Sequence, residues 1–337
     1  MRIGITYNLK SDISSLSSSS LPEDAAEEFD LPETIEAIRE VLTEEGHEVF
    51  FLGGDLSIVE KIRGLEVKFV FNIAEGFQGR SREAHIPALL ELLEIPYSGS
   101  DPLGLAITLD KSLTKRVAIS LGISTPKFWV LDEPGDFEAI PDQFPFFVKP
   151  LWQGSSKGIR RSSRVDDRSR LSDEVRRLFE NYAGEPVLVE KCIPGREVTV
   201  GILGNDSPEV LGIMEIAFRD KSQKDFCYSL EVKRNWRELV EYRFPARLDD
   251  SIEKGIRSAA VDLFEALRLR DIARVDFRIS SEGKFYFLEV NPLPGLAPTS
   301  GDIVLLVQKK GWSYREFILK IMQSAVSRYP QLNGLKV

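Results

Sequence analysis

The chain has 337 residues, of which 42% are hydrophobic and 29% are charged, and its formal net charge is −9. A chain of this length can form two or three compact units, and its composition is typical of a globular protein in solution. The negative charge argues against nucleic acid or an anionic membrane as the main partner.

Chemistry based on cysteine or histidine is disfavoured. The two cysteines and two histidines leave little scope for a disulfide scaffold, a zinc site or a Ser-His triad. The N-terminal run becomes polar too soon for a signal peptide, and no apolar run approaches the ~18 residues of a membrane span. These features predict a cytoplasmic protein that does not act at a membrane.

Residues 1–108 are predicted to form a small parallel α/β domain, because strands and amphipathic helices alternate along them. We expect strands at residues 2–7, 48–52 and 67–73 and helices at residues 32–45 and 83–93. Residues 11–30 are serine-rich and then acidic, which predicts a mobile loop.

The rest of the chain is predicted to form a larger mixed sheet with covering helices. We expect helices at residues 111–121, 167–182, 251–267 and 314–329. We expect strands at residues 144–149, 186–190, 198–203 and 210–216, and a β-hairpin at residues 272–291. No internal repeat is present.

The predicted hairpin is the most informative segment. Both halves alternate apolar and polar residues, and the Ser-Ser-Glu-Gly-Lys sequence between them is turn chemistry. With the Glu-Gly pair as a two-residue turn, Asp276 lies opposite Glu289, and Asn291 projects from the same face as Glu289. Two carboxylates and an amide oxygen are ligands that suit Mg²⁺. The alternative is a surface hairpin with solvated charges.

Two other segments are weak signals on their own. Lys149 ends a strand that runs into a Gly-Ser-Ser loop, where an ammonium group and backbone N–H groups can hold phosphate. Glu190-Lys191 and Glu197 offer polar groups that could meet adenine and ribose. Neither a P-loop nor a G-x-G-x-x-G sequence occurs in the chain.

Taken in order, these segments resemble the ATP-grasp ligases, and within them the D-alanine–D-alanine ligase family. The resemblance extends from about residue 70 to residue 315. Its motifs are Lys149-Pro150, Gly154-Ser155-Ser156, Glu190-Lys191, Gly195-Arg196-Glu197, Arg274-Val275-Asp276, Glu289-Val290-Asn291 and Pro294-Gly295.

The resemblance implies an ATP-grasp fold preceded by a small parallel, Rossmann-like N-terminal domain. The implied divisions are an N-terminal domain at 1–108, a central subdomain at 109–186 and a C-terminal subdomain with the metal site at 187–337. The implied activity is ATP-dependent ligation of a carboxylate and an amine through an acyl phosphate. D-Alanine–D-alanine ligation, a step of peptidoglycan synthesis, is the default reaction, and a homodimer is frequent in this family.

The resemblance also assigns residues to roles. ATP binding falls to Lys111, Lys149, Ser155, Glu190, Lys191, Ile193 and Glu197. Two Mg²⁺ ions, replaceable by Mn²⁺, are held by Asp276, Glu289 and Asn291. The catalytic contacts are made by Arg274, the Gly295 amide, Ser156 and Lys233. Ser300 contacts the carboxylate of the attacking amino acid.

The match is weakest where the first substrate is expected to bind. The family glutamate that receives the ammonium group of the first D-alanine has no counterpart in the N-terminal segment, and Glu23, Glu27 or Glu28 could substitute for it. Glu75 stands where a histidine is usual, and Arg80 and Arg82 add positive charge close by.

Near the metal site, Pro292 and Leu293 replace a usual small polar pair, and after the mobile-loop lysine Arg234 replaces a common tyrosine. Two alternatives to the default reaction therefore stay open. One is ligation of another amino acid or small peptide by the same mechanism, with Glu75 and Arg80 as substrate contacts and the arginines binding an extra acidic group. The other is a non-catalytic, nucleotide-binding regulatory protein.

Overall fold

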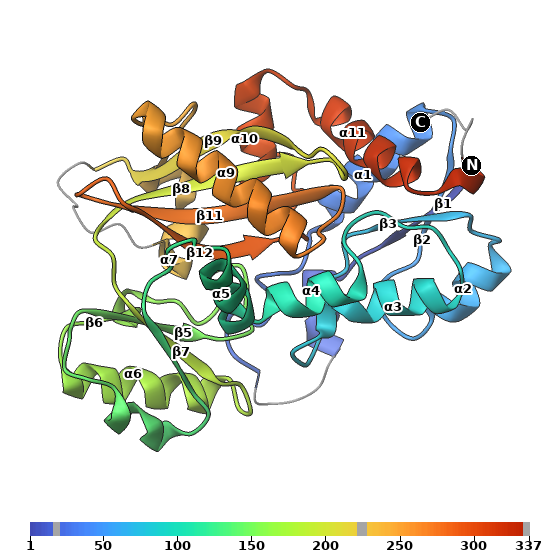
Figure 1. The fold of residues 1–337 in the computed structure, drawn as a ribbon. Coiled ribbons are helices and arrows are strands. Elements are labelled where there is room, and N and C mark those ends of the chain that lie inside the picture. The colour runs from blue at the N-terminus through green and yellow to red at the C-terminus, as the bar shows by residue number, and fades with distance from the viewer. Residues whose placement is uncertain (16–20, 221–227, 333–337) are drawn as a thin grey trace.

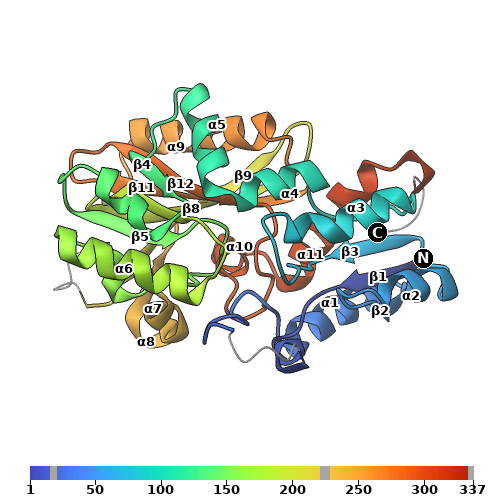
Figure 2. The ribbon, with the colours of Figure 1, turned by 90° about the horizontal axis from the view of Figure 1, so that it is seen from below.

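The computed structural model describes residues 1–15, 21–220 and 228–332. The described chain forms three units, an N-terminal unit with a parallel sheet and two units that each contain an antiparallel sheet (Figures 1 and 2). Within the described ranges, no helix is long and apolar enough to cross a membrane.

The N-terminal unit contains the parallel sheet that the sequence predicts, with strand order β2-β1-β3. Its elements are β1 (Arg2–Thr6), α1 (Pro32–Glu44), β2 (Glu48–Phe51), α2 (Ile58–Gly64), β3 (Phe69–Asn72), α3 (His85–Leu92) and α4 (Pro102–Leu109). Successive side chains of β3 point to opposite faces of the sheet. Phe69 and Phe71 pack towards α1, whereas Val70 packs towards α2 and α3. Both faces are buried, which explains why the strand is continuously apolar.

The central unit is a four-stranded antiparallel sheet covered by one helix. Its elements are β4 (Phe128–Leu131), β5 (Phe146–Pro150), β6 (Arg164–Val165), α6 (Arg168–Asn181) and β7 (Val187–Lys191). The strand order is β4-β7-β5-β6. The boundary expected after residue 186 falls just before β7, and the pairing of β7 with β4 and β5 puts this strand in the central sheet.

The C-terminal unit is a five-stranded antiparallel sheet of order β10-β9-β8-β11-β12. Its strands are β8 (Gly195–Leu203), β9 (Glu209–Phe218), β10 (Val240–Arg243), β11 (Ile272–Ser280) and β12 (Phe285–Asn291). Its helices are α5 (Lys111–Ser120), α7 (Leu230–Arg234), α8 (Trp236–Leu239), α9 (Asp250–Ala266), α10 (Asp302–Lys310) and α11 (Tyr314–Ser327). Helices α5 and α9 cover one face of the sheet, and α10 packs on the other (Figure 1).

The hairpin of β11 and β12 has the expected pairing but a different turn. Asp276 lies opposite Glu289, as predicted. The turn spans residues 280–283, one residue earlier than expected, since the Gly283 N–H donates to the Ser280 carbonyl oxygen at 3.0 Å. A register shift next to Asp276 leaves Leu288 without a cross-strand partner. This bulge restores the pairing that places the two carboxylates together.

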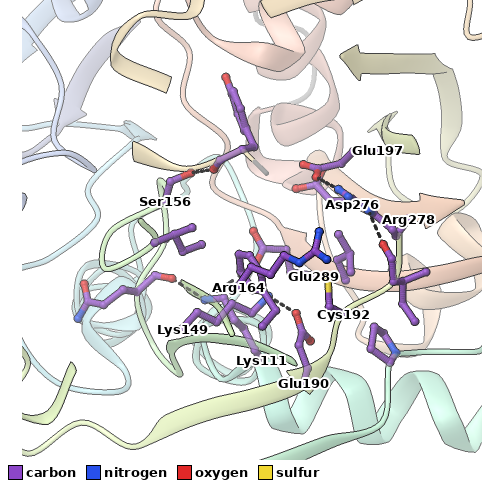
Figure 3. A pocket seen from close by; sticks show the side chains of 18 of the residues that line it. Lys111, Lys149, Ser156, Arg164, Glu190, Cys192, Glu197, Asp276, Arg278 and Glu289 are labelled. Atoms are coloured by element: carbon purple, nitrogen blue, oxygen red, sulfur yellow. Dashed lines mark hydrogen bonds and ion pairs between the residues drawn. The ribbon is translucent and has the colours of Figure 1, made fainter. Parts of the chain in front are cut away.

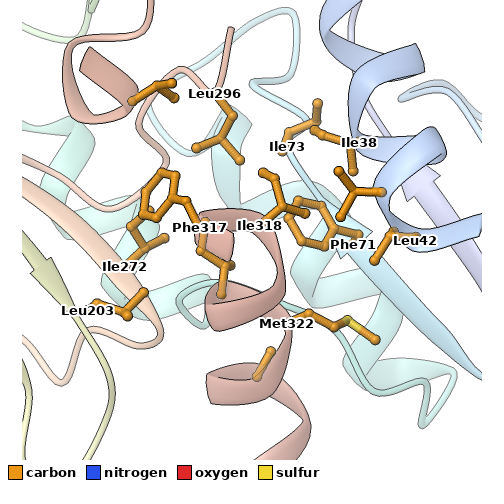
Figure 4. Close-up of a cluster of buried hydrophobic side chains, with 14 of the residues drawn as sticks. Ile38, Leu42, Phe71, Ile73, Leu203, Ile272, Leu296, Phe317, Ile318 and Met322 are labelled. Carbon is orange, nitrogen blue, oxygen red and sulfur yellow. The ribbon is translucent and has the colours of Figure 1, made fainter. Parts of the chain in front are cut away.

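Helix α11 joins the last part of the chain to the first. Phe317, Ile318 and Met322 pack into one apolar cluster with Ile38 of α1 and Phe71 of β3 (Figure 4). The cluster continues to Leu203 and Ile272 of the C-terminal sheet. The N-terminal sheet and the C-terminal unit therefore share one core.

Replacing Phe317 by alanine should destabilise the protein strongly, because the fully buried ring lies inside this shared core. Loss of such a ring costs about 3–5 kcal/mol, and the thermal unfolding midpoint should fall by about 5 °C or more. Leu92→Ala is the matched control, since the Leu92 side chain is 79% exposed and its loss should cost under about 0.5 kcal/mol. Equal midpoints for the two variants would contradict the docking of α11.

Candidate active site

A cleft between the four-stranded and five-stranded sheets contains the residues expected to bind ATP (Figure 3). Strands β5 and β7 form one wall, and β8, β11 and β12 form the other. All seven predicted ATP-binding residues line this one cleft: Lys111, Lys149, Ser155, Glu190, Lys191, Ile193 and Glu197.

Glu190 is the electrostatic centre of the cleft. Its Oε1 lies 2.9 Å from Lys149 Nζ and its Oε2 lies 2.8 Å from Lys115 Nζ. Burial alone would raise the pKa of the Glu190 carboxyl, but the two ammonium groups outweigh it and lower this pKa to about 2. The same pairing raises the pKa of Lys149 despite its burial. Lys149 therefore stays charged, with donors left for phosphate oxygens.

Lys115 is a fully buried residue that supports Glu190 beside the cleft, and the sequence patterns did not identify it. It lies four residues after Lys111 on α5, so both side chains project from one face of the helix. Its ammonium also donates to Thr125 Oγ1 at 3.0 Å. The two lysines at this helical spacing, ahead of a glycine-rich loop, are the signal that could have identified it.

Lys111 is positioned by the start of α5. The Asp110 carboxylate accepts a hydrogen bond from the Ser112 N–H at 3.0 Å and so caps the helix. Lys111 Nζ then reaches the Gln153 carbonyl oxygen at 2.5 Å and lies 4.0 Å from Glu289 Oε2. Lys111 thus connects the glycine-rich loop to the β11–β12 hairpin.

At the far end of the cleft, an unpredicted arginine organises the predicted residues. Arg278 donates from Nε to the Ile193 carbonyl oxygen at 3.0 Å, and its Nη1 lies 2.8 Å from Glu197 Oε2. Burial raises the pKa of Glu197 to about 7 although Arg278 opposes this. The Lys191 ammonium donates to the Phe144 carbonyl oxygen at 3.0 Å, so the backbone just before β5 engages that charge.

The three predicted metal ligands lie together at the end of the hairpin that faces the cleft. Asp276 and Glu289 are cross-strand partners, and Asn291 Nδ2 lies 3.1 Å from Asp276 Oδ2. Two carboxylates and an amide fit Mg²⁺, which keeps part of its shell for water and phosphate. Among the described residues, no three His, Cys, Asp or Glu side chains could hold a metal ion by themselves. The donor set therefore suits an ion that completes its shell with nucleotide oxygens.

Arg274 is fixed in the cleft by two carboxylates. Its Nη2 lies 3.1 Å from Asp276 Oδ2, and its Nη1 lies 3.3 Å from Asp302 Oδ2. Asp302 is held in turn by the Tyr242 hydroxyl, which donates to it at 2.9 Å. These carboxylates raise the pKa of Arg274 against the effect of burial, so the guanidinium is permanently charged.

The loop at residues 154–156 has a strained backbone. Ser155 and Ser156 have φ angles of 49° and 61°, in a region that costs a non-glycine residue about 1–2 kcal/mol. Ser156 Oγ donates to the Tyr228 carbonyl oxygen at 2.8 Å, and the Gly154 N–H donates to the Glu28 carboxylate. Contacts with two distant segments therefore hold the loop in place.

The acidic segment at residues 21–30 is docked on this loop, which corrects the prediction of a mobile loop for these residues. Asp24 accepts hydrogen bonds from the Gly158 N–H at 2.9 Å and the Tyr182 hydroxyl at 2.5 Å. It also pairs with Arg160 at 2.9 Å. Residues 16–20 of the predicted loop lie outside the described residues.

The three glutamates that could replace the family's first-substrate glutamate are all paired with cations. Glu28 lies 2.8 Å from Arg82 and 3.1 Å from Lys157. Glu23 and Glu27 lie 2.6 and 2.7 Å from Arg234. These carboxylates fasten the acidic segment to the central unit and to α7.

A second cavity, of about 540 Å³, adjoins the nucleotide cleft and is lined by most of the other predicted substrate and catalytic residues, although Ser156 lines the nucleotide cleft alone. Ser300, Gly295 and Glu75 line it, and Asn291 faces it from the hairpin. The two cavities share one wall, formed by Lys111, Gly154, Ser155, Tyr228, Lys233, Arg274, Glu289 and Asp302.

Arg80, a predicted substrate contact, lines neither cavity. Its guanidinium lies 5.8 Å from the Trp152 ring centre and 3.3 Å from Asp110 Oδ2, and its side chain is 57% exposed. Arg82 is buried but is neutralised by Glu28. The geometry therefore gives no support to the hypothesis that these arginines bind an acidic group of a substrate.

Comparisons with known proteins agree with this architecture. The family model described as D-ala D-ala ligase C-terminus matches residues 120–323. The D-alanine–D-alanine ligase of Aquifex aeolicus is 34% identical over 286 residues, which cover 85% of this chain and 92% of that protein. The protein y4sG of Sinorhizobium fredii is 33% identical over 297 residues, 86% of each chain.

A solved structure shows the same fold over nearly the whole chain. The crystal structure of the D-alanine–D-alanine ligase from Bacillus anthracis complexed with ATP has a TM-score of 0.71 and 22% sequence identity. The match covers 97% of this chain and 98% of that chain.

The fold and the cleft define an ATP-grasp ligase, an enzyme that couples ATP to bond formation. The chain belongs to the D-alanine–D-alanine ligase family. This membership favours an enzyme over the alternative of a purely regulatory nucleotide-binding protein.

Glu28→Gln should destabilise the protein at neutral pH, because it leaves Arg82 buried without its charge partner, a loss of about 3–5 kcal/mol. Burial would raise the pKa of Glu28, but Arg82 and Lys157 lower it from 4.5 to about 2. This contribution to stability is present above pH ~4.5 and is lost as the pH falls towards 2. Thermal midpoints between pH 7 and 3 should therefore fall less steeply for the variant than for the wild type.

Glu83→Gln is the matched control for Glu28→Gln. Glu83 is also buried and lines the same cavity, but its pKa is raised by burial to about 7. Its stabilising contribution is therefore lost as the pH rises, the opposite sign to Glu28. Similar pH slopes for both variants would show that the Glu28 network is not formed.

Proposed function

We propose that the chain joins two amino acids through a peptide bond at the expense of ATP, with D-alanine–D-alanine ligation as the reaction indicated by the names of its relatives. The observation that carries the proposal is the wall shared by the two cavities. This wall contains Lys111, Lys233 and Arg274. A phosphoryl group on one side can reach a carboxylate on the other while it stays beside these cations.

The nucleotide cleft binds ATP in this proposal. Lys111 and Lys149 hold phosphate oxygens as point charges, and the backbone N–H groups near Ser155 and Ser156 face the same oxygens. Glu197, which lines the same cleft, binds the ribose. The predicted adenine contacts are the strand end at Glu190 and the segment that follows it.

The hairpin holds Mg²⁺, or Mn²⁺ in its place, through Asp276, Glu289 and Asn291. Asp276 lines the nucleotide cleft, Asn291 lines the substrate cavity, and Glu289 lines both, which supports two ions that share Glu289. The bound metal neutralises charge on the transferred phosphoryl group.

The reaction has two steps, and each uses groups of the shared wall. The carboxylate oxygen of the first amino acid attacks the γ-phosphorus of ATP, and ADP leaves, which gives an acyl phosphate. The amine of the second amino acid, having lost a proton, attacks the acyl carbon, and the tetrahedral oxyanion expels phosphate. Arg274 and the Gly295 N–H stabilise that oxyanion, and Ser300 binds the carboxylate of the attacking amino acid. One such donor contributes about 10²–10³ in rate.

The acyl phosphate must be shielded from water, and the docked acidic segment supports this part of the proposal. Glu28 and Asp24 hold the loop that contains Ser156 over the cleft. Closure of this kind excludes water from reactive intermediates. We place the reaction in the cytoplasm, in agreement with the sparse cysteines, and expect a homodimer as in other members of the family.

The activity is tested by ADP release with ATP, Mg²⁺ and pairs of D- and L-amino acids, with the product identified by mass spectrometry. Formation of a dipeptide in step with ADP is the expected result. Absence of turnover with every pair of amino acids and small peptides would contradict the proposal.

Glu289→Gln should lower kcat by about 10²-fold or more while the thermal midpoint changes little. The metal loses a charged ligand, whereas the ion pair of Glu289 with the rest of the described chain is a contact of 4.0 Å with Lys111. Glu282→Gln, in the turn of the same hairpin, is the matched control because its side chain is 74% exposed. Wild-type activity of Glu289→Gln at low Mg²⁺ would show that the metal lies elsewhere.

A further inference from the structure

The substrate cavity has an acidic inner end formed by the N-terminal unit. Asp30 precedes α1, Glu75 follows β3, and Glu83 lies in the short 3₁₀ helix η2 (Arg82–Ala84). All three side chains line the cavity. Within the described part of the chain, none of the three carboxylates makes a hydrogen bond or an ion pair.

Backbone contacts hold these three segments together. Asn8, which is buried, accepts the Asp30 N–H on its carbonyl oxygen at 2.9 Å and the Gly76 N–H on its Oδ1 at 2.9 Å. Gly76 has a φ of +73°, and a Cβ there would lie 2.5 Å from the Arg82 carbonyl oxygen. This close approach holds the backbone around Glu75 against the backbone around Glu83. Backbone contacts therefore determine the positions of the three segments that form the acidic end.

Glu83 differs from every other buried acid in the described chain. It is only 8% exposed, and it alone makes no ion pair, since Arg82 and Lys111 act on it only at longer range. The other buried acids each have an ion pair of 3.3 Å or shorter: Asp24, Glu28, Asp110, Glu174, Glu190, Glu215, Asp271 and Asp302. A buried carboxylate without a partner is costly, so the missing cation at Glu83 points to a ligand.

The charge distribution of the cavity indicates the chemistry of that ligand. Burial raises the pKa of Asp30 and Glu83 to about 7, and burial together with Glu83 raises the pKa of Glu75. A cation among them would favour the ionised carboxylates. The opposite wall carries Lys233 and Arg274. The cavity therefore fits a molecule with a carboxylate at one end and positive charge at the other.

The number of acidic groups exceeds what one amino group needs. Glu28, Glu27 and Glu23 are engaged by arginines and Lys157, so the α-ammonium of an amino acid must also be met by the three unpaired carboxylates. With all three carboxyl groups ionised, a single ammonium group would leave negative charge that Arg82 and Lys111, already engaged by Glu28 and Glu289, offset only in part. Two ammonium groups balance them more closely. An organic cation is indicated, because these residues are not arranged to hold a metal ion.

We propose that the first substrate of this ligase is an amino acid with a second amino group on its side chain, bound by Asp30, Glu75 and Glu83. The proposal rests on the ligase reaction above and names its first substrate. Glu75, which stands where the family has a histidine, then acts with Glu83 as a specificity-determining residue. The α-carboxylate of the substrate faces Arg274 and Lys233, where phosphorylation takes place.

The test compares first substrates with D-alanine as the attacking amino acid. D-2,3-Diaminopropionate, D-ornithine, D-lysine, D-serine and D-alanine are each supplied with ATP and Mg²⁺, and ADP release and the dipeptide sequence are measured. We expect kcat/KM for at least one diamino acid in the first position to exceed that for D-alanine by about tenfold or more, the range of one hydrogen bond to a charged group. The L-forms are included to fix stereochemistry.

Two variants assign the effect to the acidic end. Glu83→Gln should lower kcat/KM for the diamino acid by about tenfold to a hundredfold, a larger factor than for D-alanine, which has no side-chain ammonium group to lose. Glu75→His restores the residue usual in the family and should shift preference towards D-alanine. Glu60→Gln, on the exposed surface of α2 in the same unit, is the control and should match the wild type. Thermal midpoints show that each variant is folded.

Each outcome decides between the proposal and its competitors. Equal or better use of D-alanine or D-serine in the first position by the wild type overturns it, as does an equal loss for all first substrates in Glu83→Gln. These results would leave the ligase reaction intact, since ADP would still form. Absence of ADP with every pair would instead overturn the proposed function.

Discussion

The active cleft depends on one carboxylate that neutralises two buried lysines. Glu190, on β7, pairs with Lys149 on the neighbouring strand β5 and with Lys115 on α5. An unpaired charge in this position would cost several kcal/mol, so the helix and the central sheet must lie together for either lysine to remain buried. Because Lys111 lies on the same face of α5, the same ion pairs also determine where that lysine meets the loop and the metal-binding hairpin.

Paired carboxylates also position the acidic segment before α1, on the other side of the cleft. Asp24 and Glu28 accept backbone N–H groups of the glycine-rich loop and pair with its cations. The loop can therefore hold two serines in the left-handed region, because contacts from a distant segment compensate for the strain. The cleft is covered by residues from the N-terminal unit, and loop conformation and domain arrangement are linked.

Local patterns predicted much of the fold but little of its long-range contacts. The periodicity of the chain identified α1, α5, α6, α9 and α11 and the strands of the hairpin, since each buries one face within a short stretch. Short elements such as β4 and α10 were missed because four to nine residues give little periodic signal. The pairing of Asp276 with Glu289 was correct although the turn was not, because a bulge at Leu288 compensates for the early turn.

In the candidate site, too, local patterns predicted residues correctly where long-range contacts were missed. The seven predicted ATP-binding residues line one cleft, since their spacing along the chain carries the family pattern. Lys115, Arg278 and the docking of Glu28 were missed because their partners are far away in sequence. Arg80 was misplaced for a related reason. Its positive charge near the expected substrate segment predicted a ligand contact, but Arg80 instead contacts Asp110 and the Trp152 ring at the surface.

The position of α11 has a consequence for how the chain acquires its structure. Phe317 and Ile318 complete the core that begins with Ile3 and Ile38, about three hundred residues earlier. During synthesis, the face of the first sheet that α1 and α11 share emerges covered by α1 alone, and it stays only partly covered until α11 has left the ribosome. Exposed apolar surface of this kind promotes aggregation of folding intermediates. The N-terminal unit should therefore depend on chaperones for longer than its own size would require.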